Sequence, residues 1–275
     1  MKINTDVLIT IFLANTLTLV LIFVRFSFLT KEIKLSFFRK LFMVFNSNLF
    51  NIIPIPGLVE AVKYNDIKKF AGKENSLYIV TIEKLSSLIV YFLLIILIFS
   101  FLNLQFYTFS FFSLILFLAL IILYKKKYNL PYVNYPFQRL AIYYKNFNYI
   151  FFTTFFISGI LQTLSVLIPL YIFYELRILQ PANFATGFFI IILSNFIASL
   201  PISVLGIGIR DMSYFFLGAY FLSISPNDSL VVSSILNILA MCNQFICIIV
   251  SVCYFFWKKN YNSSSKIKKQ YQLQN

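Results

Sequence analysis

The chain has no histidine, and only 12% of its 275 residues are charged. The absence of histidine removes the commonest metal ligand and the commonest general base. Soluble domains carry roughly a quarter charged residues, so this composition argues against an ordinary soluble fold. No polar segment is long enough to bury a core of its own. Any chemistry is therefore expected in or at a membrane.

Cysteine is also scarce. Cys242, Cys247 and Cys253 all lie in the last apolar run, without the spacing of a disulfide framework or a zinc site. The first apolar run, 7–24, lacks a small-residue cleavage site and is followed by Arg25. We therefore expect a retained helix rather than a signal peptide. Neither a metal nor another cofactor is predicted.

Hydrophobic residues make up 60% of the chain, and the mean hydropathy is +0.85. Several apolar runs approach or exceed the roughly 20 helical residues that cross a bilayer. The runs are continuous rather than alternating, which favours helices over strands. We predict an all-α, polytopic integral membrane protein with six to eight membrane helices. The runs are 7–24, 41–59, 77–101, 106–124, 147–174, 184–200, 212–224 and 229–257.

The net charge of +14 could suggest a nucleic-acid partner, and an AT-rich codon bias would also enrich lysine. However, the basic residues cluster in short loops between apolar runs, which is how membrane topology is encoded. We therefore expect no nucleic-acid partner. Apart from Lys2, Arg177 and Arg210, the basic residues form four groups. These are Arg25, Lys31, Lys34, Arg39 and Lys40; Lys63, Lys68, Lys69, Lys73 and Lys84; Lys125, Lys126, Lys127, Arg139 and Lys145; and Lys258, Lys259, Lys266, Lys268 and Lys269.

Short basic loops stay in the cytoplasm, so all four groups should share that side. The run 41–59 has a basic group on both flanks, which predicts that it enters from the cytoplasm and returns. Its break is expected at Pro54, Pro56 and Gly57, because proline removes a backbone donor and disfavours helix before it. The N-terminus is then outside, and the basic tail 258–275 is cytoplasmic.

The segment 184–224 must leave from the outer side and return to it. It is broken from Pro201 to Asp211, either as two short crossings or as a hairpin that dips in from outside. The order of helix, broken hairpin and helix thus occurs twice within a single membrane domain, 1–257. This order suggests an inverted repeat of 7–101 and 147–257. Transporters built this way hold their substrate where interrupted helices meet.

Ionisable residues inside membrane segments cost about 3 kcal/mol and usually have a partner and a task. Arg210 and Asp211 are two such residues, and Gly206 and Gly208 beside them let the backbone turn sharply and leave room for a ligand. A guanidinium close to a helix N-terminus suits a phosphate group. The alternative is that Arg210 and Asp211 lie in a cytoplasmic loop and pair with each other or with solvent.

Glu60 and Glu83 are the other two ionisable candidates. Glu83 opens the stretch "TIEKLSSLIVYFLL". An acid suits the N-terminus of a helix, so Glu83 can also be interpreted as a marker of the cytoplasmic helix end. Glu60 is open to the same interpretation.

The stretch "PISVLGIGIRDMSYFFL" resembles the signature of the lysylphosphatidylglycerol synthase transmembrane-region family. Asp211 stands where that family usually has glutamate, and Met212 where it has glycine. The residues that agree are Pro201, Ser203, Gly206, Gly208 and Arg210.

The N-terminal half is similar to the same family more loosely, through Asn51, Pro54 and Glu60. In "IVTIEKLSSLIVYF", Glu83 is kept, whereas Lys84 replaces arginine and Ser87 replaces aspartate. The resemblance covers roughly 45–257.

The resemblance implies a bacterial inner-membrane domain associated with lipid translocation. The aminoacyl-transferase domain of the bifunctional members is not expected here. We predict a flippase-like protein whose partners are membrane lipids. In this hypothesis Arg210 binds an anionic head group, and Glu60, Glu83 and Asp211 balance or gate it. The alternatives are a membrane-embedded transferase acting on a lipid-linked donor, or an accessory subunit of another membrane enzyme. An enzymatic activity is not predicted, because no catalytic motif was found.

Overall fold

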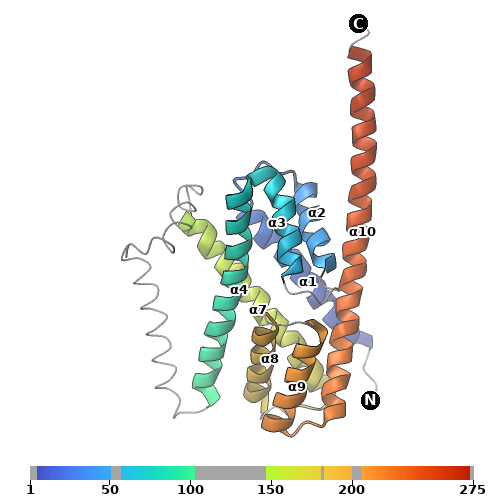
Figure 1. The fold of residues 1–275 in the computed structure, drawn as a ribbon. Coiled ribbons are helices and arrows are strands. Elements are labelled where there is room, and N and C mark those ends of the chain that lie inside the picture. Colours follow the sequence, from blue (N-terminus) through green and yellow to red (C-terminus); the bar gives the residue numbers. More distant parts are fainter. Residues whose placement is uncertain (1–4, 51–56, 103–146, 181–182, 200–205, 273–275) are drawn as a thin grey trace, which may run out of the picture.

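The computed structural model describes residues 5–50, 57–102, 147–180, 183–199 and 206–272, and these residues form helices without a strand. Figure 1 shows the arrangement of the helices. Their bounds are α1 (Thr5–Leu29), α2 (Phe37–Leu49), α3 (Leu58–Ala71), α4 (Lys73–Leu102), α7 (Phe147–Glu175), α8 (Phe184–Ser199), α9 (Gly206–Leu222) and α10 (Pro226–Gln272).

Four of the described helices are long and apolar enough to cross a membrane. The apolar spans are Thr5–Leu29, Lys73–Ile98, Tyr149–Glu175 and Asn227–Phe256, in α1, α4, α7 and α10. The prediction of a helical membrane protein is confirmed at this level. The run 106–124 lies outside the described residues, and the six to eight spans stay a prediction.

Two pairs of shorter helices lie at opposite ends of the bundle (Figure 1). In one pair α2 packs against α3, and in the other α8 packs against α9. Gly57, at the start of α3, has φ of +75°, a left-handed conformation that glycine adopts without steric cost. The predicted break is therefore confirmed at Gly57, while Pro54 and Pro56 lie outside the described residues. Whether either pair is re-entrant stays a prediction.

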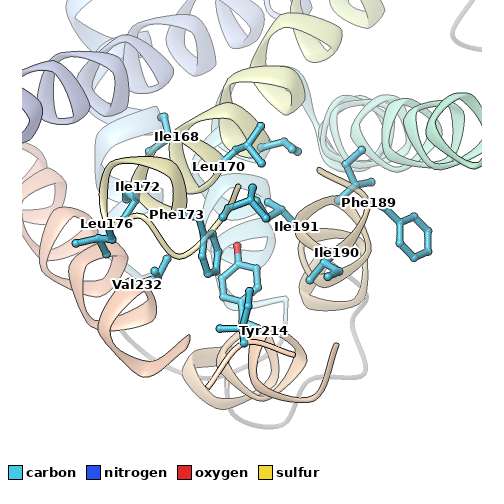
Figure 2. Packing of buried hydrophobic residues seen from close by; sticks show 14 of the residues in the cluster. Ile168, Leu170, Ile172, Phe173, Leu176, Phe189, Ile190, Ile191, Tyr214 and Val232 are labelled. Atoms are coloured by element: carbon cyan, nitrogen blue, oxygen red, sulfur yellow. The ribbon is translucent and has the colours of Figure 1, made fainter. Parts of the chain in front are cut away.

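Two apolar clusters stabilise the bundle. The first joins the second half of α7 to α8, α9 and α10, and Figure 2 shows their side chains meeting. Within it the rings of Phe173 and Tyr214 lie 6.1 Å apart, edge to face. The second joins the end of α1 to α2, α3 and the start of α4, through residues such as Phe26, Val44 and Ile67.

The last helix, α10, begins at a local capping motif. The Ser225 hydroxyl accepts a hydrogen bond from the Asp228 amide at 3.2 Å and donates one to its carboxylate at 2.7 Å. Pro226 suits the first helical position, where its missing N–H costs nothing. The predicted tail from 258 is helical up to Gln272, as a continuation of α10 that extends beyond the rest of the bundle (Figure 1).

Candidate functional site

A charged cluster, formed by Arg25, Lys63 and Glu83, lies inside the bundle. One Glu83 carboxylate oxygen accepts a hydrogen bond from Arg25 Nη2 at 2.8 Å and another from Lys63 Nζ at 2.9 Å. The other Glu83 oxygen lies 3.0 Å from the same lysine nitrogen. Arg25 is 7% exposed, and Lys63 and Glu83 are each 6% exposed. These are therefore buried ion pairs, shielded from water.

The hairpin of α3 and α4 explains why Lys63 meets Glu83. Gly72 ends α3 with φ of +80°, and α4 begins at the next residue and packs back against α3. In such a hairpin, residues at equal distances before and after the turn face each other. Lys63 and Glu83 are nearly equidistant from Gly72, and Glu60 and Lys84 are equidistant from it. Both pairs form ion pairs, and Lys84 Nζ lies 2.8 Å from a Glu60 oxygen.

The Glu60–Lys84 pair is less buried than the charged cluster, with side chains 33% and 40% exposed. Burial acts to raise the pKa of Glu60. The hydrogen bond and charge of Lys84, with the charge of Lys63, lower it by more. The pKa of this carboxyl group therefore lies below its ordinary value, and Glu60 is held ionised.

Serine hydroxyls surround the guanidinium of Arg25. Arg25 Nη1 donates to Ser87 Oγ at 2.8 Å and to Ser158 Oγ at 3.1 Å, which links α1 to α4 and α7. Ser158 also shares a hydrogen bond of 3.0 Å with Ser86. Arg25 Nε is buried and makes no hydrogen bond. The Nε–H of the guanidinium is thus left without an acceptor.

The charged cluster carries an excess positive charge, because two cations share one carboxylate. Moving a charge into a low-dielectric interior is costly unless it is paired and hydrogen-bonded. The Glu60–Lys84 pair is neutral as a whole and does not remove the excess. The site therefore favours an additional negative charge.

A polar seam continues from the charged cluster along the contact between α4 and α7. It consists of Ser86, Ser87 and Tyr91 on α4, and Ser158 and Ser165 on α7, with the Tyr91 hydroxyl 3.2 Å from that of Ser165. Eight residues separate Glu83 from Tyr91, or about 12 Å along the helix.

The seam connects to α8, where the Asn195 amide donates to the Ser165 carbonyl at 3.2 Å. Along α4, the second apolar cluster extends to Ile82 and the first begins at Tyr91. Along α7, the second apolar cluster extends to Phe151 and the first begins at Val166. On α4 and α7, the charged cluster and the seam thus form a polar layer between the two apolar clusters, whereas on α1 Arg25 lies within the second cluster, between Leu19 and Phe26.

Two of the predicted residues, Glu60 and Glu83, lie in this region. The interpretation of Glu83 as a helix-end marker is wrong, because α4 begins at Lys73 and Glu83 lies in its third turn. Ten residues precede it, about 15 Å of helix. The same interpretation does fit the position of Glu60 in the first turn of α3. Its carboxylate is nevertheless bonded to Lys84 rather than only solvated.

The second predicted group lies on α9. This helix begins at Gly206, so Gly206 and Gly208 belong to its first turn, and Arg210 and Asp211 follow directly. The two glycines are helical rather than part of a sharp turn, which corrects the expectation for them. The side chains of Arg210 and Asp211, and both Pro201 and Ser203, lie outside the described residues. Helix α9 packs on α8, and α8 packs on α4, which carries Glu83.

The charge pattern predicts that Arg25 and Lys63 lie in loops, which is wrong, because both are buried within helices; their cytoplasmic side stays a prediction. The apolar pattern continues past Arg25 through "FSFL", and α1 ends only at Leu29. That continuation was the available signal for a buried arginine. For Lys63 the sequence holds no comparable signal, because α3 mixes apolar and charged residues along its whole length.

Glu175 and Arg177 lie at an exposed turn at the end of α7. Helix α7 ends at Glu175, and Arg177 is exposed with φ of +57°. The described residues contain no group of three His, Cys, Asp or Glu side chains that could hold a metal ion. Of the ionic arrangements in the described chain, the charged cluster is the most deeply buried.

The chain was compared with known proteins in three ways, and no family model, no curated protein and no solved structure matches it. The resemblance carried by the glycine and arginine motif therefore stays a prediction.

Proposed function

We propose that this chain is a flippase-like membrane protein that binds an anionic phospholipid head group within its helix bundle and translocates it. The observation that supports the proposal is the polar layer with its excess positive charge, set between the two apolar clusters on α4 and α7. A lipid that changes leaflet can keep its chains in the bilayer, so only its head group needs a polar path. A cationic, hydroxyl-lined layer provides the chemistry for such a path.

The free energy that it costs to bury charged groups in the polar layer supports a functional role for this layer. Each ionisable group inside a membrane helix costs about 2.5–3.5 kcal/mol on insertion scales, and such groups commonly mark substrate or ion pathways. Hydroxyl pairs such as Ser86 with Ser158 also stabilise helix packing, but a charged pair is not needed for packing alone. An apolar replacement of similar volume would hold the helices at least as well.

Arg210 has a second place in this proposal. It follows the N-terminus of α9, where free backbone N–H groups and the helix dipole favour an anion. In the proposal the head group moves between Arg210 and the charged cluster along the polar seam. The α8 helix connects the two regions, because it packs against both α9 and α4.

The alternative of a membrane transferase has less support in the described residues. Such an enzyme needs a free carboxylate or another base beside its substrate. Glu60 and Glu83 are both engaged by lysines at hydrogen-bond distance. Neither carboxylate is therefore available as a general base in this conformation.

The test is a lipid-translocation assay in proteoliposomes with fluorescently labelled phosphatidylglycerol and, separately, labelled phosphatidylcholine. We expect faster translocation of the anionic lipid than protein-free vesicles show. Replacing Arg210→Ala should abolish it, whereas Arg177→Ala, in an exposed turn, should leave it unchanged. Wild-type protein that moves neither lipid would refute the proposal. Full transport by Arg210→Ala would remove Arg210 from it.

A further inference from the structure

We propose that Arg25 and Lys63 form a binding site for a phosphate group and that Glu83 holds the two cations ready for it. The phosphate is either the phosphodiester of a lipid head group or a free phosphate ion. This inference rests on the proposed function and deepens it, because it names a second anion contact. The resemblance to a known family assigned no role to Arg25 or Lys63.

The donors around Arg25 support the assignment. Glu83 accepts from one N–H of Nη2, the two serine hydroxyls accept from Nη1, and the Nε–H is buried without an acceptor. Buried donors are usually satisfied by protein groups or ordered water, and a bound anion can take the same place. A phosphate oxygen is a strong acceptor for a guanidinium N–H. The buried Nε–H of Arg25 is therefore the donor to which the phosphate would bind.

The charge of the cluster points to the same ligand. Arg25 and Lys63 together carry two positive charges against the single negative charge of Glu83. A phosphodiester carries one negative charge, so its binding would bring the cluster to neutrality. Glu83 needs only to keep one cation partner while the phosphate binds the other. A neutral or cationic head group would leave the excess charge unpaired.

The electrostatics predict opposite effects for two substitutions. Glu83→Gln removes a negative charge next to the site, and one unit charge at close range changes a binding energy by several kcal/mol at an effective dielectric of about 20. We expect the Kd for phosphate to fall about tenfold or more. Arg25→Lys keeps the positive charge but removes the Nε–H and the planar fork. We expect the Kd to rise by roughly tenfold.

The experiment measures the thermal unfolding midpoint of the full chain in detergent as sodium phosphate is added at constant ionic strength, with sodium chloride as reference. A ligand that binds only the folded state raises the midpoint with concentration. The matched control is Glu60→Gln, which removes a nearby but partly exposed carboxylate. It should change the Kd by less than about twofold.

A second series replaces phosphate with micelles that contain phosphatidylglycerol or phosphatidylcholine. Stabilisation by phosphatidylglycerol, lost in Arg25→Lys, identifies the lipid head group as the ligand. Stabilisation by phosphate alone identifies a site for the free ion. If Glu83→Gln cannot be purified, the comparison of wild type with Arg25→Lys decides the question.

The inference is overturned if phosphate stabilises wild type, Glu83→Gln and Arg25→Lys equally, or none of them. Lipid translocation without phosphate binding would leave the proposed function intact and remove only this site. Phosphate binding without lipid translocation would keep the site and remove the flippase function.

Discussion

The sharpest consequence of the charged cluster concerns the stability of the chain when Glu83 is replaced by alanine. The substitution removes the partner of Arg25 at 2.8 Å and of Lys63 at 2.9 Å, and it leaves both cations buried together. Breaking a buried ion pair in this way costs about 3–5 kcal/mol, because an uncompensated charge remains inside. The remaining hydrogen bonds of Arg25, to Ser87 and Ser158, do not neutralise its charge.

The matched control is Glu60→Ala, which breaks a single ion pair of the same 2.8 Å length on the same hairpin. Its side chains are partly exposed, and such pairs contribute about 0–1 kcal/mol. Since 1 kcal/mol shifts the midpoint of a large domain by about 2–4 °C, Glu83→Ala should lower it by roughly 6–20 °C. Glu60→Ala should lower it by about 4 °C at most.

The protein provides its own reporter for this measurement. Cys247 is buried at 1% exposure, whereas Cys253 is exposed. In a background with Cys242→Ser and Cys253→Ser, a thiol-reactive dye would report the unfolding that uncovers Cys247. Equal and small shifts for Glu83→Ala and Glu60→Ala would refute the assignment of Glu83 to a buried, charge-critical position.

The same structure predicts the outcome of four further experiments. Arg25→Lys should lower the unfolding midpoint by several degrees, because one ammonium group cannot reproduce the contacts of the guanidinium with α4 and α7; a wild-type midpoint would contradict it. Gly57→Ala should destabilise the protein by about 1 kcal/mol, because its φ of +75° disfavours any Cβ. Gly159 lies in the middle of α7 with open space around it, so Gly159→Ala should instead be neutral or stabilising. The unfolding midpoints of Gly57→Ala and Gly159→Ala, compared with each other, check both expectations. The pKa of Glu60 is lower in the folded protein than its ordinary value. The ion pair of Glu60 therefore stabilises the folded state fully at a pH above the ordinary carboxyl pKa. This stabilisation is lost as the pH falls through the pKa of the folded state. The difference in midpoint between wild type and Glu60→Gln should therefore shrink as the pH is lowered below about 4.

The membrane class and the long helices could be predicted from the sequence. Continuous apolar runs with few charges leave only helices as a way to satisfy the backbone inside a bilayer. The break at Gly57 was also predictable, since two prolines and a glycine in four residues interrupt any helix. These features depend on backbone hydrogen bonding and on residues that are close together in the sequence. Both are the same whatever the tertiary structure.

The role of individual charged residues was less predictable. By charge alone, Arg25 and Lys63 are expected in loops, because topology rules count cations without regard to the helix face that they occupy. Glu83 is a candidate from the sequence and the structure buries it, but its partners could not be predicted. They lie 58 and 20 residues away along the chain, on two other helices.

The sequence by itself thus determined a helical membrane protein with interrupted short helices and a few ionisable residues in or beside its apolar runs. The tertiary structure decided which of those residues meet. The fold of α3 back onto α4 at Gly72 placed Lys63 on Glu83, and the packing of α1 on α7 brought Arg25 to Ser158. A buried charge is tolerated only with its partners in place, and partners distant in sequence come together only when the helices pack.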